Sequence, residues 1–198
     1  MVNAFVENLN ALRRLQTGLR GDLVVVRMWR PEDARGLFEA IDASREHLGR
    51  WMDWVDRHQT IEDAQEYIAR AAVSFTEGEQ IGLGIFDARD GLTVLGGTGY
   101  HEIDWEVPAL ETGYWISAAA QGHGYVTETV RLLTDFAFAE LGANRMAIHC
   151  DPGNYRSRRV AERAGYRLEG QLRNKARTPN GGLRDTLVFS MIPADRIP

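Results

Sequence analysis

The apolar positions near the start of the chain predict two helices with a strand between them. Residues 4–16 repeat apolar side chains at helical spacing, which predicts a helix that packs on the domain or on a neighbouring subunit. Residues 23–28 are rich in valine and predict a strand, and Pro31 then opens a second helix. The inward-facing residues of these two helices are Phe5, Leu9, Leu12, Leu37, Phe38 and Ile41.

The middle of the chain predicts a long helix followed by a hairpin and a further strand. Thr60 and Asp63 have the spacing of a helix start, and Gly78 predicts where this helix, residues 61–77, ends. Residues 80–87 and 93–104 predict strands joined through Asp90-Gly91, and residues 111–117 predict the next strand. These strands form the expected central sheet.

The remaining pattern predicts two more helices and three more strands. A helix after Gly124 has Val126, Val130, Leu133 and Ala137 on one stripe and Gly142 at its end. Residues 145–150 predict a strand, after which Asn154 can cap a helix that Gly165 ends. Residues 166–172 and 183–192 predict two strands around the polar loop at residues 179–182. The fold class is therefore α+β.

Length and composition favour one domain in the cytoplasm. The chain has 198 residues, of which 44% are hydrophobic, so it can bury one substantial core. We expect a helical extension over residues 1–20 and a single domain over residues 21–198. No apolar run is long enough to span a bilayer, and the start of the chain lacks the pattern of a secretory signal.

Charge and metal-binding residue types exclude several classes of partner. A net charge of −5 argues against broad nucleic-acid binding and suits a cationic amine substrate. The single cysteine, Cys150, cannot form an internal disulfide, and the five histidines show no metal-ligand spacing, so we expect no metal site. We expect no membrane partner, and a homodimer would cover the amphipathic N-terminal helix and the sheet edges.

The segment from residue 111 to residue 128 joins an apolar strand to a helix through a glycine turn. Gly122 and Gly124 allow a sharp turn, and the helix that follows begins with amide groups that have no intrahelical acceptor. Phosphate gains from these amides and from the positive end of the helix dipole. The spacing matches neither the dinucleotide fingerprint nor the nucleotide-hydrolysing loop, so nucleotide hydrolysis is not expected.

Two motifs in this order resemble the GNAT N-acetyltransferases. The first runs from Gln121 to Val126 and is similar to the acetyl-coenzyme A signature Q/R-x-x-G-x-G/A. The second, from Asn154 to Tyr166, is similar to the N-x-x-S segment with its glycine-aromatic helix exit. Residues 113–115, 124–128 and 47–55 narrow the resemblance to the RimJ/RimL-like subgroup, and the likeness covers about residues 22–192.

The resemblance implies a mixed, mostly antiparallel sheet flanked by helices, with acetyl-coenzyme A held where two central strands part. It assigns the pyrophosphate to the turn residues Gln121, Gly122, His123, Gly124, Tyr125, Val126 and Thr127. Valine stands at 126 where the signature has Gly or Ala, so its side chain must turn inward or crowd the pyrophosphate. The resemblance also places Asn154 beside the pantetheine arm and Ser157 near the thioester sulfur, where a hydroxyl could protonate the thiolate. Arginines of the same helix could reach the cofactor phosphates.

The general base has one first choice and three alternatives. Glu111 lies just before Gly113-Tyr114-Trp115 on the strand next to the expected cleft, and its carboxylate could draw the proton through water. The alternatives are His101, Glu102 and His149. Cys150 is not expected to be a nucleophile, for two reasons. Its side chain faces away from that of its neighbour His149, and the resemblance implies direct attack of the amine on the thioester, without an acyl-enzyme.

Aromatic residues are the candidates for the acceptor site. Trp51 and Trp54 lie three positions apart, and Tyr114 lies on the central strand, so together they could wall a cleft. The expected activity is acetyl transfer to a primary amine, foremost a protein N-terminal amine of the ribosomal-protein type. The alternatives are a small amine, such as an aminoglycoside or polyamine, and a non-catalytic coenzyme A binding module.

Overall fold

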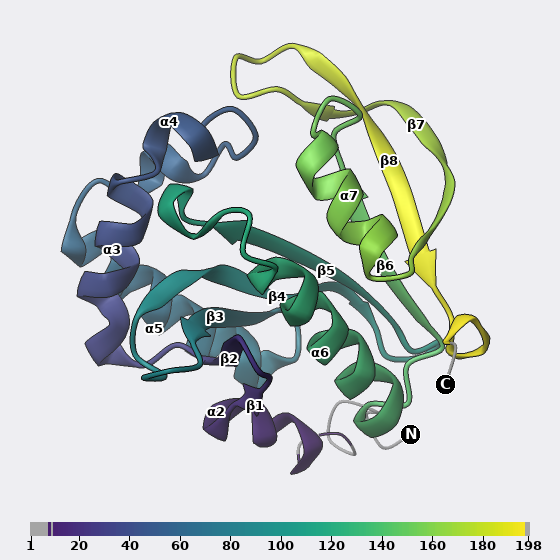
Figure 1. Ribbon diagram of the computed structural model, residues 1–198, viewed down its shortest axis with the longest axis horizontal. Coiled ribbons are helices and arrows are strands. Elements are labelled where there is room, and N and C mark those ends of the chain that lie inside the picture. Colours follow the sequence, from purple (N-terminus) through teal and green to yellow (C-terminus); the bar gives the residue numbers. More distant parts are fainter. Residues whose placement is uncertain (1–7, 9, 197–198) are drawn as a thin grey trace.

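The structure is a computed structural model that describes residue 8 and residues 10–196. Within these residues a single sheet of eight strands crosses the molecule, with α3, α4 and α5 on one side and α6 and α7 on the other (Figure 1). The strand order is β1-β2-β3-β4-β5-β6-β8-β7, and every neighbouring pair is antiparallel except β5 with β6. The predicted α+β class and mixed, mostly antiparallel sheet are confirmed.

The first half of the chain contains the elements α2 (Arg14–Thr17), β1 (Leu19–Arg20), β2 (Val24–Met28), η1 (Pro31–Asp33), α3 (Ala34–Asp42), α4 (Arg45–Leu48), η2 (Val55–Arg57), α5 (Ile61–Glu77), β3 (Ile81–Asp87) and β4 (Val94–Asp104). Helix α5 has the predicted bounds, with a capping box between Thr60 and Asp63 and a left-handed Gly78 at its end. Neither β1 nor α4 was predicted, because segments of two and four residues show no periodicity. Phe5 and Leu9 lie outside the described residues, while Leu12 is fully buried in the main core.

The second half contains β5 (Ala109–Ile116), η3 (Ala118–Ala120), α6 (Tyr125–Glu140), β6 (Arg145–Cys150), α7 (Tyr155–Arg163), β7 (Arg167–Arg177), β8 (Leu183–Met191) and η4 (Pro193–Asp195). Strand β7 continues five residues beyond the predicted end at residue 172, through a bulge between Leu172 and Ala176. The turn glycines at 142 and 165 adopt positive φ, as expected of helix ends.

Strands β5 and β6 part after a short pairing, and this split positions the site. They are parallel and pair only at Ala109, Leu110 and Glu111 of β5. Strand β5 then continues to Ile116 alongside β4, while β6 continues to Cys150 alongside β8. The edge of β5 beyond Glu111 therefore faces a gap in the sheet rather than another strand.

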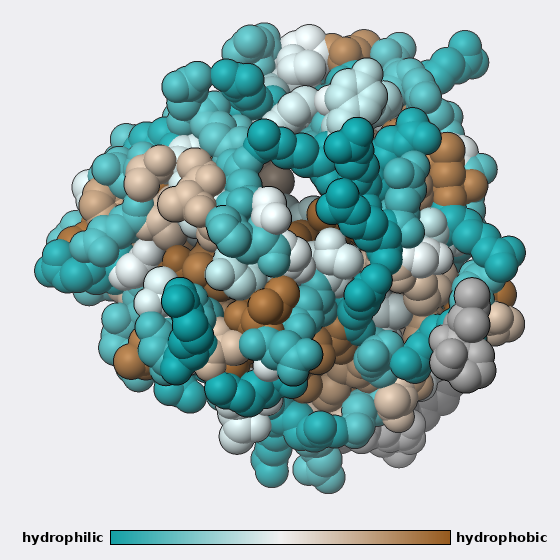
Figure 2. All heavy atoms as spheres, viewed as in Figure 1, coloured by the Kyte–Doolittle hydropathy of each residue, from teal (hydrophilic) through white to brown (hydrophobic). Residues whose placement is uncertain are grey.

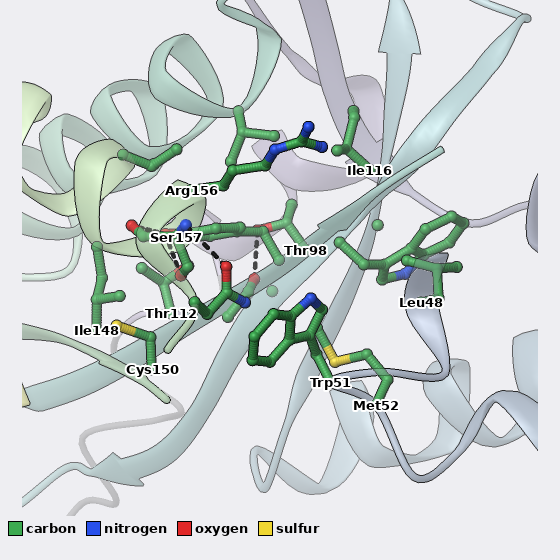
Figure 3. A pocket seen from close by; sticks show the side chains of 18 of the residues that line it. Leu48, Trp51, Met52, Thr98, Thr112, Ile116, Ile148, Cys150, Arg156 and Ser157 are labelled. Atoms are coloured by element: carbon green, nitrogen blue, oxygen red, sulfur yellow. Dashed lines mark hydrogen bonds between the residues drawn. The ribbon is translucent and has the colours of Figure 1, made fainter. Parts of the chain in front are cut away.

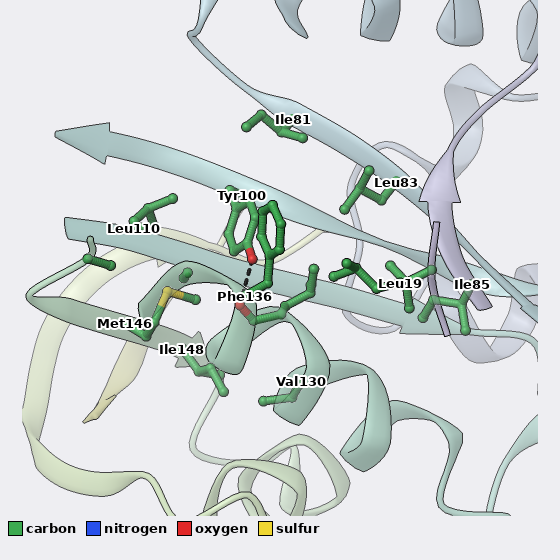
Figure 4. Close-up of a cluster of buried hydrophobic side chains, with 14 of the residues drawn as sticks. Leu19, Ile81, Leu83, Ile85, Tyr100, Leu110, Val130, Phe136, Met146 and Ile148 are labelled. Atoms are coloured by element: carbon green, nitrogen blue, oxygen red, sulfur yellow. Dashed lines mark hydrogen bonds between the residues drawn. The ribbon is translucent and has the colours of Figure 1, made fainter. Parts of the chain in front are cut away.

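The larger of two buried apolar clusters holds α6 against the sheet. Val130 and Leu133 of α6 are fully buried in the same cluster as Ile81, Leu83 and other sheet residues. Figure 4 shows Val130 on the helix and Ile81 and Leu83 on the sheet. The hydroxyl of the buried Tyr100 donates to the backbone oxygen of Leu133 at 2.6 Å, which satisfies both polar groups inside this core. Because α6 is fixed along its length, the turn at its N-terminus is also held in place. Within residues 10–196, no helix is long and apolar enough to cross a membrane.

Candidate active site

A cavity of about 1420 Å³ lies at the split between β5 and β6. Figure 2 shows the molecule hollowed between the α4 side and the α7 side, with an opening rimmed by hydrophilic side chains. Ser157 and Cys150 border it from one side, and Leu48 and Trp51 border it from the other (Figure 3). Chain segments that are more than a hundred residues apart in the sequence therefore share one cavity.

The glycine turn forms a cradle at the N-terminus of α6. Gly122 and Gly124 have φ values of 82° and 86°, a conformation that disfavours any residue with a Cβ. No side chain caps α6, and within the described residues no protein acceptor takes the backbone N–H groups of Tyr125, Val126 and Thr127. These amides, with the dipole of a 16-residue helix behind them, fit a phosphate group.

Six of the seven predicted turn residues line the cavity: Gln121, Gly122, Gly124, Tyr125, Val126 and Thr127. The exposed His123 does not line it, and its ring stacks on Tyr125 with the centroids 5.5 Å apart. Val126 is partly buried and packs against the main core. Its branched side chain therefore contacts the core while the residue also borders the cavity.

Glu128 ties this turn to the turn between β1 and β2, a role that the motif at residues 124–128 does not predict. Its carboxylate accepts the backbone N–H groups of Asp22, Leu23 and Val24 at 3.0, 2.8 and 2.9 Å. Gly21 leaves room for it, because a Cβ there would lie 2.6 Å from the carboxyl carbon. The first turn of α6 is therefore tied to the β1–β2 turn by three charge-assisted hydrogen bonds.

Ser157 and Tyr114 meet on the same side of the sheet as α6. Asn154 caps α7 by accepting the Ser157 N–H at 3.1 Å. The Tyr114 hydroxyl lies 3.0 Å from Ser157 Oγ and donates to the Ser157 backbone oxygen at 3.1 Å. Burial raises the pKa of Tyr114 far above its usual value, so its phenol stays protonated. Two protonated hydroxyl groups are therefore available here, and both residues line the cavity.

Two further side chains on this side of the sheet are the Thr112 hydroxyl, which is free to bind a ligand, and the Cys150 thiol, which is not activated as a nucleophile. Thr112 is fully buried and lines the cavity, yet its hydroxyl has no hydrogen-bond partner within the described residues. Such a group fits a polar ligand lying along the open edge of β5. Cys150 lies nearby, and burial raises the pKa of its thiol, which disfavours the nucleophilic thiolate.

Helix α7 brings three arginines to the cavity and pairs the fourth. Arg156, Arg159 and Arg163 line the cavity, while Arg158 forms an ion pair with Glu162 at 2.8 Å. Burial, followed by the charge of Arg156, lowers the pKa of His47 across the cavity. Positive charge thus gathers in the same cavity as the phosphate cradle, as coenzyme A phosphates require.

Glu111 lies on the other face of the sheet between two histidines. Its Oε2 atom is 2.7 Å from His149 Nδ1, and its Oε1 atom is 3.8 Å from His101 Nδ1. Its side chain is only 14% exposed. Because side chains alternate along a strand, Glu111 and Tyr114 face opposite sides of β5 and approach the split from both directions. The first-choice base and two of its three alternatives therefore form one cluster.

The predicted acceptor tryptophans occupy different environments. Trp51 reaches into the cavity (Figure 3), and its backbone oxygen accepts from Arg184 Nη2 at 3.3 Å. Arg184 also lies 3.6 Å from Asp151, so it links the α4–η2 segment to the loop after β6. Trp54 lines the cavity but packs edge-on against Trp115, with the ring centroids 5.8 Å apart.

Sequence reasoning missed Arg184 and the contact between Glu111 and His149. Arg184 lies 133 positions from Trp51, and the register of β5 with β6 decides which residue of β6 meets Glu111. Only the chain topology brings these groups together. The alternation of His149 and Cys150 between opposite faces was the one available signal.

Comparison with known proteins agrees with this geometry. Residues 24–167 match the family described as acetyltransferase (GNAT) domain. YdaF of Bacillus subtilis, named provisionally as a ribosomal N-acetyltransferase, is 31% identical over 172 residues, which cover 85% of this chain and 91% of YdaF. Ribosomal-protein-serine acetyltransferase of Escherichia coli is 25% identical over 79% of this chain and 85% of its own length.

A solved relative was crystallised with the expected cosubstrate. The microcin C7 self-immunity acetyltransferase MccE, in complex with acetyl-CoA and AMP, superposes with a TM-score of 0.80 at 25% identity, covering 87% of this chain and 93% of MccE. Within the described residues, no cluster of His, Cys, Asp and Glu could hold a metal ion. This chain belongs to the GNAT acetyltransferases, resembles their RimJ/RimL-like subgroup, and is an acetyl-CoA-dependent N-acetyltransferase.

Proposed function

We propose that this enzyme acetylates a protein N-terminal amine, of the ribosomal-protein type, by direct attack of the amine on acetyl-CoA. The observation that carries the proposal is the split between β5 and β6, which opens one cavity to groups on both faces of the sheet. Tyr114 and Ser157 approach it from the α6 side, and Glu111 approaches from the other. A donor and an acceptor can therefore meet there from opposite sides, which suits a two-substrate transfer.

The α6 side suits the donor. The free amides after Gly122 and Gly124 would bind the pyrophosphate, and arginines of α7 would bind the remaining phosphate charge. The open edge of β5 with the unpaired Thr112 hydroxyl would take the polar pantetheine arm. When bound, acetyl-CoA supplies the acetyl group as a thioester.

Ser157 and Tyr114 would protonate the departing sulfur. Both hydroxyl groups lie at the same point of the cavity, 3.0 Å apart, so both can donate toward a sulfur atom bound there. Cys150 is left without a covalent role, in line with direct attack. On the opposite face, the cluster around Glu111 would accept the proton of the amine.

The charge of the cavity favours a peptide end over a polycation. Apart from the three arginines of α7 that we assign to the cofactor phosphates, its lining contains four arginines, Arg50, Arg57, Arg70 and Arg184, and three carboxylates, Glu102, Glu111 and Asp151. An aminoglycoside or polyamine carries several positive charges and would need more carboxylates. A peptide end carries a single reacting amine, so it needs no further carboxylates, and aromatic residues such as Trp51 can border it. A ribosomal-type acceptor would also place the enzyme in the cytoplasm.

The acceptor class can be tested by direct competition. The purified protein is incubated with acetyl-CoA and equal amounts of a peptide with N-terminal serine, the same peptide with a blocked N-terminus and an internal lysine, spermidine and an aminoglycoside. Mass spectrometry then locates the acetyl group. Acetylation of the free N-terminal amine alone supports the proposal, whereas preferred acetylation of spermidine or the aminoglycoside would overturn the peptide assignment.

A further inference from the structure

We infer that His149, rather than Glu111, is the general base, and that Glu111 is a positioning residue that holds the His149 imidazole. This inference rests on the proposed function and names the atom that takes the amine proton. It starts from the contact of 2.7 Å between Glu111 Oε2 and His149 Nδ1. The two side chains come from neighbouring strands at the point where β5 and β6 part.

The contact assigns the proton of the imidazole. A carboxylate oxygen can only accept, so a proton on Nδ1 makes this distance favourable, while a lone pair on Nδ1 would face another lone pair. With Nδ1 protonated, the neutral ring carries its free lone pair on Nε2. Nε2 is therefore the basic atom of the pair, oriented by the carboxylate behind the ring.

The other two candidates in the cluster are less suited to the role. The two oxygens of Glu111 lie beside two imidazoles, and its side chain is nearly buried. His101 lies 3.8 Å from Glu111, and a Cβ built on Gly113 would come within 2.8 Å of its Nε2 atom, so that atom lies against the strand backbone.

His149 has a route for the proton to leave. It lines the main cavity and also a second cavity of about 250 Å³, which is bordered by the end of β6 and by residues of β7 and β8. The second cavity is bordered by the exposed Lys175, so it reaches the surface. Glu111 on β5 contacts His149, and His101 on β4 lies at the other oxygen of Glu111. The other charged or titratable residues that line these cavities with His149 include Cys150 on β6, Asp151 after it, Glu102 on β4, Lys175 on β7 and Arg184 on β8.

The step balances without a further reactant. The amine nitrogen forms a bond to the acetyl carbon, the bond from that carbon to sulfur breaks, and the sulfur takes a proton from the hydroxyl pair of Ser157 and Tyr114. One proton of the amine passes to His149 Nε2 and leaves to solvent, and solvent reprotonates the hydroxyl pair. No electrons are exchanged with an oxidant or reductant.

Chemical rescue separates a base from a structural residue. His149→Ala should lower kcat/KM for the accepted amine by about 100-fold or more. Added imidazoles should restore part of it, in the order of their basicity, with the acetyl-CoA dissociation constant unchanged. His101 on β4 has a similarly exposed side chain, so His101→Ala is the matched control. The rate of His101→Ala should still fall at acidic pH, whereas that of His149→Ala should not. Near wild-type activity in His149→Ala, or no response to imidazole, would overturn the inference.

A second measurement needs no acceptor. In ¹⁵N NMR spectra of the whole protein, the His149 signals, assigned by their loss in His149→Gln, should show the proton on Nδ1 in the neutral ring. A proton on Nε2 would overturn the inference even if no amine were found. Conversely, a wild-type protein that releases thiol only with an amine would uphold the proposed function even if both tests of His149 failed.

Discussion

Replacing Gly124 tests the phosphate cradle, in which backbone amides rather than side chains would bind the phosphate. Gly124 has φ 86° and ψ −8°, and a Cβ there would meet only Leu23 Cδ1 at 3.6 Å. The cost of Gly124→Val is therefore backbone strain rather than crowding, about 1–3 kcal/mol for a β-branched residue in this conformation. If the turn moves to relieve the strain, at least one amide-phosphate hydrogen bond is lost. Such a charge-assisted bond contributes about 1.5–3 kcal/mol, so acetyl-CoA should bind roughly 10- to 100-fold more weakly.

Gly142 provides the matched control at the other end of the same helix. It also has a positive φ, 62°, with nothing within 4 Å of a built Cβ, and a helix of this length separates the two glycines by about 24 Å. Urea unfolding should show a similar loss of stability in Gly142→Val, and calorimetry should show unchanged acetyl-CoA affinity. Wild-type affinity in a folded Gly124→Val protein would refute the placement of the phosphates at this turn.

Three further changes test other parts of the site. Ser157→Ala should lower kcat about 10- to 100-fold at unchanged acetyl-CoA affinity. Because the two hydroxyls act together, the double variant with Tyr114→Phe should lose less activity than the product of the two single losses. An unchanged kcat in Ser157→Ala would exclude Ser157 as the proton donor. Glu128→Gln should lower the free energy of unfolding by about 2 kcal/mol and Tm by about 4–8 °C, because three N–H groups lose their carboxylate; an unchanged urea midpoint would contradict this. The pKa of Glu169 is lowered from 4.5 to about 2, first by Arg145, so its contribution to stability is full above pH 4.5 and is lost as the pH falls toward 2; a stability difference between wild type and Glu169→Gln that persists at pH 2 would argue against it.

The sequence predicts the elements whose ends carry strong local signals. The capping box at Thr60 and the left-handed Gly78 bound α5 at the predicted residues. Asn154 caps α7 as expected, so Ser157 lies in its first turn. Backbone hydrogen bonding at helix ends depends on neighbouring residues alone, which makes it readable from the chain.

Features that depend on strand register cannot be predicted from local signals such as helix caps. The sequence places Glu111 and His149 on strands, but only the register of β5 with β6 and their early separation bring the two side chains within 2.7 Å. Glu128 belongs to a motif visible in the sequence, yet its partners are backbone amides more than a hundred positions away. Long-range contacts of this kind leave no periodic trace in the chain.

The most direct test of the account is calorimetric titration of the protein with acetyl-CoA, followed in the same sample by a peptide with a free N-terminal serine while thiol release is recorded. We expect micromolar binding of acetyl-CoA and thiol release that begins only when the peptide is added. Absence of acetyl-CoA binding would contradict the assignment of the cavity, and binding without release for any amine would contradict acetyl transfer as its function.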